Sequence, residues 1–511
     1  MPTRPGPNVR DASWSAPLWA RAMLVAAALG LFALRFADRD LITYVLDEPQ
    51  LQDAAQAQAA ARTWARINVL TGTQGVRYGP APLWFYTAVH RVAGPLPERS
   101  ILATTVLLTL AQLGLALAVA RALGGGAVLF ATCAALLAAS PYLFYWSRTG
   151  WDNPLLGAFS AGAVAVLLLE RMRPVARGAA LGLLVGLGLC THLMALPFSL
   201  AVAAVLALEA RARRGARLEL AALLAVALLV ALPYLGALRA EPPRRSAAWE
   251  QWGGPAAPAR VGFELLEPAR ILTASGIDHF LDQAAGTFHQ RLGPARVWLE
   301  AGPLLAVLLS LAAAAGLLSA ARRDHPSARR LGRLGLLLWV GHALFLGLPA
   351  LAPEPHYQQP TAWLVPAGCC ALAMALLCRR AGAARLLVAG LWGMALLQGA
   401  ILESWMRWLR EQGGTATIHY SVPLSAQRAF LRDACDTSRP GVALANQTAL
   451  FPPSLLSLAR TEPACAGKRV GICPGRCPRL DPAWRVVPVR YAAPPAGRLV
   501  PPGREPPVSE P

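Results

Sequence analysis

Residues 101–120 read ILATTVLLTLAQLGLALAVA, an uncharged run of apolar and small residues that ends at Arg121. At a rise of 1.5 Å per residue, a helix over this run spans the roughly 30 Å of hydrocarbon in a lipid bilayer. Similar runs recur along the chain, and they predict an all-α polytopic membrane protein of about eleven transmembrane helices. The expected spans cover residues 20–37, 101–120, 127–145, 154–170, 179–192, 195–208, 218–238, 299–320, 334–351, 361–378 and 386–403.

The arginines between these runs predict the orientation in the membrane. The fifth and sixth runs are separated only by Thr191–Met194 and form either two spans or one broken helix. If they are separate, all arginine clusters fall on one side, which the positive-inside rule assigns to the cytoplasm. The N-terminus is then cytoplasmic and the C-terminus extracytoplasmic. The clusters are Arg4, Arg10 and Arg21; Arg121; Arg171, Arg173 and Arg177; Arg211, Arg213, Arg214 and Arg217; Arg322, Arg323, Arg329, Arg330 and Arg333; and Arg379, Arg380 and Arg385.

Composition supports the same class of protein. The 511 residues are 55% hydrophobic and carry a formal net charge of +20, which on a soluble chain would suggest nucleic-acid binding. Here the charge sits in short loops between apolar runs, so we exclude nucleic acid as a partner. Lys468 is the only lysine, and Ala, Gly and Pro are abundant, as in proteins from GC-rich genomes. We therefore expect a multi-pass protein of a bacterial inner (plasma) membrane.

The chain divides into a transmembrane domain, 1–403, and an extracytoplasmic tail, 404–511. The first span lacks a small-residue cleavage site and predicts a retained anchor. The tail ends in PPAGRLVPPGREPPVSEP, whose composition predicts disorder over about the last 20 residues, whereas residues 415–490 are long enough for a small domain. The outward loops of the first domain cover 38–100, 146–153, 239–298 and 352–360.

The nine cysteines fall into two groups. Four lie in the polar tail, where an even number favours disulfides in an oxidising compartment. A zinc site is the alternative, but the tail lacks a paired CxxC spacing. The other five lie in apolar runs and predict small core residues. The tail cysteines are Cys435, Cys465, Cys473 and Cys477, and the others are Cys133, Cys190, Cys369, Cys370 and Cys378.

The first outward loop opens with two adjacent acids, Asp47 and Glu48, directly after a span. A carboxylate at the membrane surface is well placed to deprotonate an acceptor hydroxyl, although acids after a helix are also found simply solvated. Further along the same loop, Arg77 and Tyr78 begin a turn with the sequence RYGPAPLWFY. Aromatic residues at this depth are also typical of an interfacial belt.

Two shorter outward loops carry further polar groups. In YWSRTGWDNP, residues 145–154, Arg148 offers a planar fork of donors for phosphate, and Asp152 is suited to position a substrate. A local Arg148–Asp152 ion pair is the alternative. In PEPHYQQP, residues 353–360, His356 and Tyr357 are placed to donate hydrogen bonds to a lipid phosphate. His192 and His342 lie within apolar segments and predict packed side chains.

In order and spacing, these loops resemble the GT-C membrane glycosyltransferases over roughly residues 20–400. The nearest group is glycosyltransferase family 39, which includes protein O-mannosyltransferases and the aminoarabinose transferases of lipid A. The resemblance rests on the acidic pair, the proline-rich turn, the SR-xxx-D loop, the glycine-rich segment 182–197 and the HYQQP loop. It implies a GT-C-like bundle, to which the arginine pattern adds a small extracytoplasmic C-terminal region. It also implies transfer of a sugar from a polyprenyl-phosphate donor to a protein, lipid or glycan acceptor at the bilayer.

The resemblance assigns roles to individual residues. Asp47 is the expected base, supported by Glu48, and Asp152 corresponds to the acid of the second loop motif. The expected catalytic residues are thus Asp47, Glu48 and Asp152, and the expected substrate- and phosphate-binding residues are Arg77, Tyr78, Arg148, His356 and Tyr357.

The sequence departs from the family at Pro49, at the turn before Pro80 and Pro82, which lacks the usual lysine or histidine, and in the cysteine-bearing tail. No cofactor follows from the sequence. A divalent metal is compatible with it, but no His/Asp cluster requires one. The alternative function is a transporter or flippase of a lipid-linked sugar. That class is expected to show internal repeats and charges within the membrane, whereas the charges here lie in loops.

Overall fold

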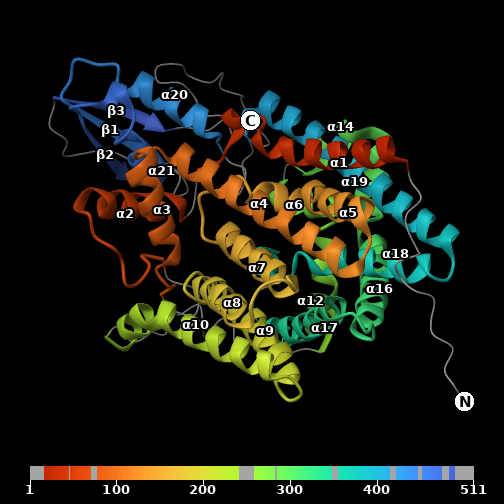
Figure 1. The fold of residues 1–511 in the computed structure, drawn as a ribbon. Coiled ribbons are helices and arrows are strands. Elements are labelled where there is room, and N and C mark those ends of the chain that lie inside the picture. The colour runs from red at the N-terminus through yellow and green to blue at the C-terminus, as the bar shows by residue number, and fades with distance from the viewer. Residues whose placement is uncertain are drawn as a thin grey trace, which may run out of the picture.

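The computed structural model describes residues 17–44, 47–70, 77–240, 258–281, 285–347, 355–414, 422–446, 452–474 and 483–489. Helices form a bundle, and a smaller unit with β-strands lies at one end of it (Figure 1). Each predicted span overlaps one of the apolar helices, and the span predicted at 127–145 covers both α5 and α6 (Pro141–Trp146). The apolar helices are α1 (Leu18–Ala33), α4 (Pro97–Leu123), α5 (Gly126–Ala139), α7 (Asn153–Leu168), α8 (Pro174–Leu189), α9 (Ala195–Ala210), α10 (Arg214–Ala240), α16 (Gly302–Ala321), α17 (Pro326–Gly347), α18 (Leu364–Leu377) and α19 (Ala381–Gln412).

The lengths and apolarity of these helices identify a multi-pass membrane protein. Among the described residues, six helical segments are long and apolar enough to cross a bilayer, and α5, α7, α8 and α9 are shorter apolar helices. A helix of 16 residues, such as α7, is about 24 Å long, which is somewhat less than the hydrocarbon thickness. The predicted number of eleven membrane-crossing helices therefore stays a prediction.

The glycines of the fifth predicted span allow α8 to pack closely on α10. Gly178, Gly182 and Gly186 recur every four residues, so they lie on one face of α8. A Cβ atom on Gly182 would lie 2.5 Å from the carbonyl oxygen of Leu223 in α10. Small residues at this spacing let two helix backbones approach each other in a membrane. Around residues 191–194 the chain forms two helices, α8 and α9, and whether each crosses the membrane separately stays a prediction.

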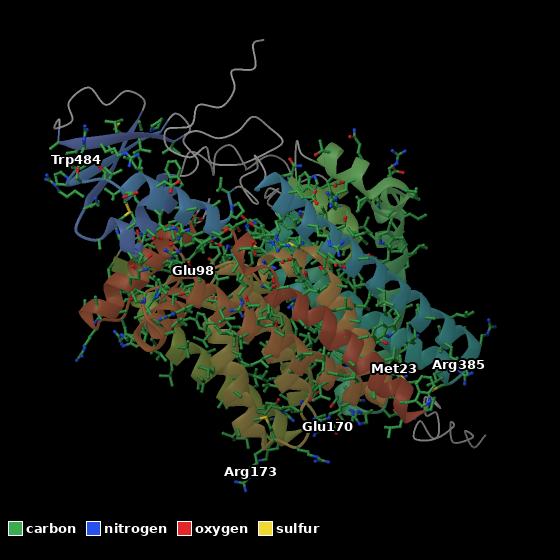
Figure 2. The ribbon with its side chains drawn as sticks, turned by 90° about the horizontal axis from the view of Figure 1, so that it is seen from above. Met23, Glu98, Glu170, Arg173, Arg385 and Trp484 are labelled. Atoms are coloured by element: carbon green, nitrogen blue, oxygen red, sulfur yellow. A yellow bond between two sulfur atoms is a disulfide. The ribbon has the colours of Figure 1, made fainter. Side chains whose placement is uncertain are left out.

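A buried cluster of ion pairs ties four helices together at the arginine-rich end of the bundle. Arg177 of α8 donates through Nε to Oε1 of Glu219 in α10 at 2.6 Å. Arg330 of α17 donates to Glu209 of α9 at 2.6 Å and to Glu219 at 3.3 Å. Figure 2 shows this end, marked by Glu170, Arg173 and Arg385, away from Glu98 and Trp484.

The outward loops contain secondary structure of their own. The first holds α2 (Glu48–Ala61) and α3 (Ala81–Ala93), which pack against each other. In the second long loop, α12 (Pro258–Arg270) packs on α16 and α17. The remaining short elements are η2 (Leu34–Phe36), η3 (Arg39–Leu41), α6 (Pro141–Trp146), η4 (Ala274–Ile277), α13 (Asp278–Leu281), α14 (Ala285–Leu292), η6 (Gly293–Ala295), α15 (Arg296–Glu300) and η7 (Pro355–Thr361).

The C-terminal region forms a small α/β domain with a three-stranded parallel sheet of order β2-β1-β3. The sequence predicted a domain here but not its sheet. A disulfide joins Cys435 to Cys465, and Cys473 is also disulfide-bonded, which confirms disulfides in the tail. Cys477 and the predicted disordered end lie outside the described residues. The elements are α20 (Leu424–Cys435), β1 (Gly441–Asn446), α21 (Pro452–Ala459), η8 (Pro463–Cys465), β2 (Arg469–Pro474) and β3 (Trp484–Val489).

Two sequence predictions need correction. Cys378 was expected in the core but is exposed, because it caps the end of α18 rather than lying within it. The other four cysteines of the apolar runs are buried, as predicted. Helix α19 also continues past the predicted end of the last span at residue 403 and reaches Gln412. In its last turns, Arg410 pairs with Asp38, which follows α1.

Candidate functional site

The adjacent acids Asp47 and Glu48 have different environments. Asp47 precedes the first residue of α2 and is half-buried, and this burial raises the pKa of its carboxyl. Glu48 is buried, and its Oε1 accepts a hydrogen bond from the backbone N–H of Gly150 at 3.1 Å. One turn later, Nε2 of Gln52 donates to the carbonyl of Gly150, also at 3.1 Å. Two side chains of α2 therefore hold the second outward loop in place, one through the N–H and one through the carbonyl of Gly150.

Asp152 lies in the same loop, directly before α7, and is fully buried. Burial raises the pKa of its carboxyl to about 8, and the negative charge of Asp47 acts in the same direction. The N–H groups of Asp152 and Asn153 oppose the rise by favouring the ionised form. The two predicted acids, far apart in the sequence, are therefore close enough to influence each other electrostatically.

Other helices fix the same loop, so the position of Asp152 is well determined. The hydroxyl of Tyr86 in α3 donates to the carbonyl of Trp151 at 2.6 Å. The hydroxyl of Thr105 in α4 donates to the carbonyl of Ser147, also at 2.6 Å. Because these partners come from different elements, the loop is held to the bundle along its length.

Tyr78 and Tyr357 meet beside the carboxyl pair. The Tyr78 ring lies 4.3 Å from the ring of His192, and His192 lies 5.7 Å from Tyr357. Burial raises the pKa of Tyr78 well above its usual value, and the negative charge of Asp152 adds to the effect. The structure therefore brings the RYGP turn and the HYQQP loop to the same place.

The RYGP turn reaches this position through a close backbone contact with the end of α8. The N–H of Ala81 donates to the carbonyl of Cys190 at 3.0 Å. A Cβ atom on Gly79 would lie 2.4 Å from that same carbonyl oxygen, so the turn requires glycine here. Arg77 is exposed, and its carbonyl accepts the hydroxyl of Tyr234 at 2.7 Å.

His356 lies in an aromatic group formed by the second and last outward loops. Its ring centre is 5.7 Å from Trp146, 5.5 Å from Trp151 and 4.3 Å from Tyr357. Trp146 is buried and Trp151 half-buried. The group lies next to Asp152, one residue after Trp151, and offers apolar ring faces beside the carboxyl pair.

Arg148, predicted to bind phosphate, is buried, and both of its terminal nitrogens contact the backbone that follows α1. Nη1 donates to the carbonyl of Ala37 at 2.9 Å and Nη2 to the carbonyl of Asp38 at 2.5 Å. These bonds join the second outward loop to the start of the first. Phosphate binding by Arg148 stays a prediction.

The small C-terminal domain contacts the segment just before Asp47. The N–H of Leu424 donates to the carbonyl of Ile42 at 2.7 Å. The Tyr44 hydroxyl lies 2.8 Å from Oγ of Ser457, which donates to Asp53 at 2.7 Å. The tail, which had no counterpart in the resemblance, thus positions the first loop.

Sequence reasoning missed Glu264 and Arg35. Glu264 of α12 is buried and accepts a hydrogen bond from Nε2 of Gln358 in the HYQQP loop at 2.8 Å. Burial and then the charge of Glu267 raise the pKa of Glu264 to about 7. Arg35 is buried and donates to Gln112 at 2.7 Å. For Arg35 the available signal was an arginine at the end of an apolar span, since such residues mark functional positions by default.

Within the described residues, no group of three or more His, Cys, Asp and Glu side chains is arranged to hold a metal ion. The compatibility of the site with a divalent metal stays a prediction.

Solved structures show which known fold this arrangement shares. ArnT from Cupriavidus metallidurans in the apo state matches with a TM-score of 0.53 and 15% identity, covering 90% of this chain and 86% of ArnT. The same protein bound to undecaprenyl phosphate matches with a TM-score of 0.53, 13% identity and the same coverage. The chain has a GT-C-like fold.

The GT-C-like fold is supported by structure alone. No protein-family model matches the sequence, and no curated protein matches it. Arabinofuranosyltransferase AftD from Mycobacteria is also similar, with a TM-score of 0.48 and 17% identity, but this chain covers only 32% of it. The fold prediction is thus confirmed, and the predicted roles of individual residues rest on the geometry described above.

Proposed function

We propose that this chain is a membrane glycosyltransferase that moves a sugar from a polyprenyl-phosphate donor to an acceptor hydroxyl or amine. The fold shared with ArnT, one of whose structures holds undecaprenyl phosphate, supports a lipid-phosphate donor. The arginine distribution supports an extracytoplasmic site in a bacterial inner membrane, with the N-terminus in the cytoplasm. The acceptor is a protein, a lipid or a glycan.

The observation that carries this proposal is the pair of neighbouring carboxyls, Asp47 and Asp152, whose pKa values are both raised by burial. Two carboxyls close together in a buried site do not readily ionise at the same pH. Because the pKa of Asp152 is about 8, that carboxyl is mostly protonated at neutral pH, which leaves Asp47 as the carboxyl available to act as a base. A half-buried carboxylate with a raised pKa is a stronger base than an exposed one. This division assigns the base to Asp47.

In the proposed step, Asp47 takes the proton of the acceptor hydroxyl or amine as the acceptor atom attacks the anomeric carbon. The bond from that carbon to the phosphate oxygen breaks, and polyprenyl phosphate leaves with the electron pair. A single displacement inverts the anomeric carbon. Since a phosphate leaving group is already stable as an anion, the reaction needs no acid of the kind that glycosidases use.

The remaining requirement is stabilisation of the phosphate charge. We assign the phosphate contact to the exposed guanidinium of Arg77, with hydrogen bonds from Tyr78, His356 and Tyr357. Arg148 contributes by holding the second outward loop, because its terminal nitrogens bind backbone carbonyls. Glu48 supports Asp47 in the same way, through its contact with Gly150.

Release of polyprenyl phosphate from synthetic polyprenyl-phosphate sugars tests this function. We expect turnover by the purified wild type in nanodiscs, and a loss of about 10²- to 10⁴-fold in Asp47→Asn, which removes the base. Asp433→Asn, an exposed position on α20, is the matched control and should keep full activity. Both variants should be folded at the assay pH and retain donor binding.

Two outcomes would contradict the proposal. Equal turnover by Asp47→Asn and wild type would remove Asp47 from the mechanism. Movement of an intact lipid-linked sugar across the bilayer, without release of polyprenyl phosphate for any donor, would instead support the transporter or flippase.

A further inference from the structure

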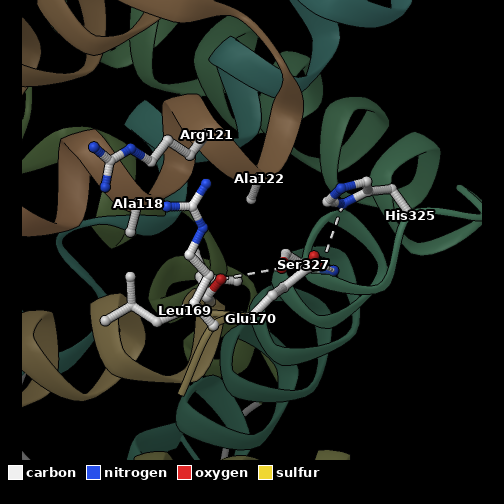
Figure 3. A pocket seen from close by; sticks show the side chains of 9 residues that line it. Ala118, Arg121, Ala122, Leu169, Glu170, His325 and Ser327 are labelled. Atoms are coloured by element: carbon white, nitrogen blue, oxygen red, sulfur yellow. Dashed lines mark hydrogen bonds and ion pairs between the residues drawn. The ribbon is translucent and has the colours of Figure 1, made fainter.

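A pocket of about 330 Å³ opens at the arginine-rich end of the bundle, where α4, α7 and α17 meet. Figure 3 shows Arg121, Glu170, His325 and Ser327 around it. This end is opposite the small C-terminal domain, as the labelled residues of Figure 2 show. The pocket is therefore separate from the candidate site around Asp47. Its size falls within the range of small-molecule sites in proteins.

Two arginines give the pocket an unbalanced positive charge. Arg121 lies in the last turn of α4, and Arg171 follows α7. Both are exposed, and within the described part of the chain neither side chain has a hydrogen bond or an ion pair. Guanidinium groups with free donors are the preferred protein ligands for phosphate.

The carboxylate of Glu170 in the pocket already has hydrogen-bond partners within the protein. Its Oε1 accepts the N–H of Ser327 at 3.1 Å and the Ser327 hydroxyl at 2.6 Å. It also lies 3.6 Å from Nδ1 of His325. These contacts cap the first turn of α17, and they direct the Glu170 carboxylate toward Ser327 and His325. The two arginines therefore remain to attract an anion.

The floor of the pocket is held rigidly. The Ser327 hydroxyl also donates to the carbonyl of Leu168 at the end of α7, at 3.0 Å. One turn along α17, Nη1 of Arg330 donates to the carbonyl of Leu167 at 3.1 Å, while its other nitrogens pair with Glu209. A pocket whose walls are fixed in this way binds without a large ordering cost.

The other wall of the pocket is apolar and lies at the membrane boundary. Ala118 and Ala122 of α4 and Leu168 and Leu169 at the end of α7 form it, and Leu169 is 37% exposed. Both helices end here after crossing the apolar region. A soluble anion would gain nothing from this wall, whereas the glycerol and acyl chains of a lipid would cover it.

We propose that this pocket binds the phosphate headgroup of an anionic membrane phospholipid. Arg121 and Arg171 contact the phosphate, and Leu169 with the two alanines covers the first carbons of the lipid. Basic pockets between membrane helices on the cytoplasmic side recognise such headgroups. The lipid joins α4, α7 and α17 and stabilises the folded chain by binding it and not the unfolded one. This inference does not depend on the proposed transferase activity.

Thermal unfolding of the purified, delipidated full chain in an uncharged detergent tests the inference. We expect phosphatidylglycerol to raise the unfolding temperature in a saturable way and phosphatidylcholine to leave it unchanged. Each arginine near an anionic lipid strengthens binding about fivefold. Arg121→Gln/Arg171→Gln should therefore weaken the apparent affinity for phosphatidylglycerol about 30-fold. The absence of any specific shift with phosphatidylglycerol would overturn the proposal.

A matched control distinguishes binding in the pocket from a general attraction between surface arginines and anionic lipid. Arg173→Gln/Arg211→Gln removes the same charge from exposed positions at the same end of the bundle, outside the pocket, and should keep wild-type affinity. Equal weakening in the two double variants would overturn the assignment to this pocket.

Leu169→Glu keeps both arginines and adds a repelling charge at a partly exposed wall position, so it should also weaken binding even if the double variant folds poorly. Wild-type affinity in a folded Leu169→Glu variant would contradict lipid binding in this pocket. Inorganic phosphate at millimolar concentration should not reproduce the shift. If it did, with the same loss in the arginine variant, the site would take a free anion and the lipid assignment would be wrong.

Discussion

Replacing Asp152 with asparagine should change how the stability of the chain depends on pH. In the folded chain, burial and the charge of Asp47 raise the pKa of Asp152 to about 8. In the unfolded chain the carboxyl titrates near its ordinary value of about 3.9. The folded state therefore holds a proton that the unfolded state has lost. The resulting stabilisation is fully present below about pH 4 and is lost as the pH rises through about 8.

The size of the effect follows from this difference in pKa. Between the two pKa values, the free energy of unfolding falls by about 1.4 kcal/mol for each pH unit. From about pH 5 to about pH 8 the wild type loses roughly 4 kcal/mol through Asp152, and Asp152→Asn has no proton to lose there. The two proteins should be most alike at low pH, where both side chains are neutral.

Thermal unfolding followed by tryptophan fluorescence from pH 5 to pH 9 measures this difference. The unfolding temperature of Asp152→Asn should increase relative to that of the wild type as the pH rises. The exposed Asp433→Asn variant should have the wild-type pH dependence throughout. Asp47→Asn removes the neighbouring charge and should reduce the pH dependence in part. Parallel curves for Asp152→Asn and the wild type would refute the raised pKa of Asp152.

Three further predictions concern the C-terminal domain and the packing of the helices. Replacing Cys435 and Cys465 with serine opens a link across a sequence separation of 30, and should lower the unfolding free energy of the C-terminal domain by about 3.6 kcal/mol in urea; an unchanged urea midpoint would contradict it. Glu219→Gln leaves two buried arginines without its carboxylate and should lower the free energy of unfolding by roughly 3–5 kcal/mol, seen as a lower unfolding temperature. An unchanged temperature would show that the ion-pair cluster does not stabilise the fold. Tyr44→Phe removes the hydroxyl contact with Ser457 and should lower kcat about fivefold, unless the C-terminal domain plays no part in positioning the first loop.

The membrane helices could be predicted because the bilayer imposes a simple rule on the sequence. A run such as 101–120 must be apolar along its whole length, and helix α4 does cover it. The parallel sheet of the tail had no such signal. Strand β1, with the sequence GVALAN, is only six residues long, and a short apolar run does not distinguish a strand from a buried helix. Its partners β2 and β3 follow it in the chain at distances that the sequence does not define.

The site was predictable at the level of loops but not of contacts. The resemblance singled out the loops of Asp47, Asp152 and Tyr357, and the structure places all three near Tyr78. Residue type alone suggested phosphate for Arg148, yet its terminal nitrogens bind carbonyls after α1. Buried Glu264 comes from a long loop with no motif. Such contacts depend on which backbone groups are left unsatisfied once the helices pack, and this information is not local in the sequence.

The adjacent acids show how the fold distinguishes two residues that the sequence presents alike. Glu48 is directed into the protein, where it accepts the N–H of Gly150, so its role is to hold the loop that carries Asp152. Asp47, one residue earlier, remains half-buried. Its segment is fixed on one side by Tyr44, through the C-terminal domain, and on the other by Glu48. A base works best when its backbone is fixed and its carboxylate is still accessible to substrate. Asp47 meets both conditions because its neighbour provides the anchor.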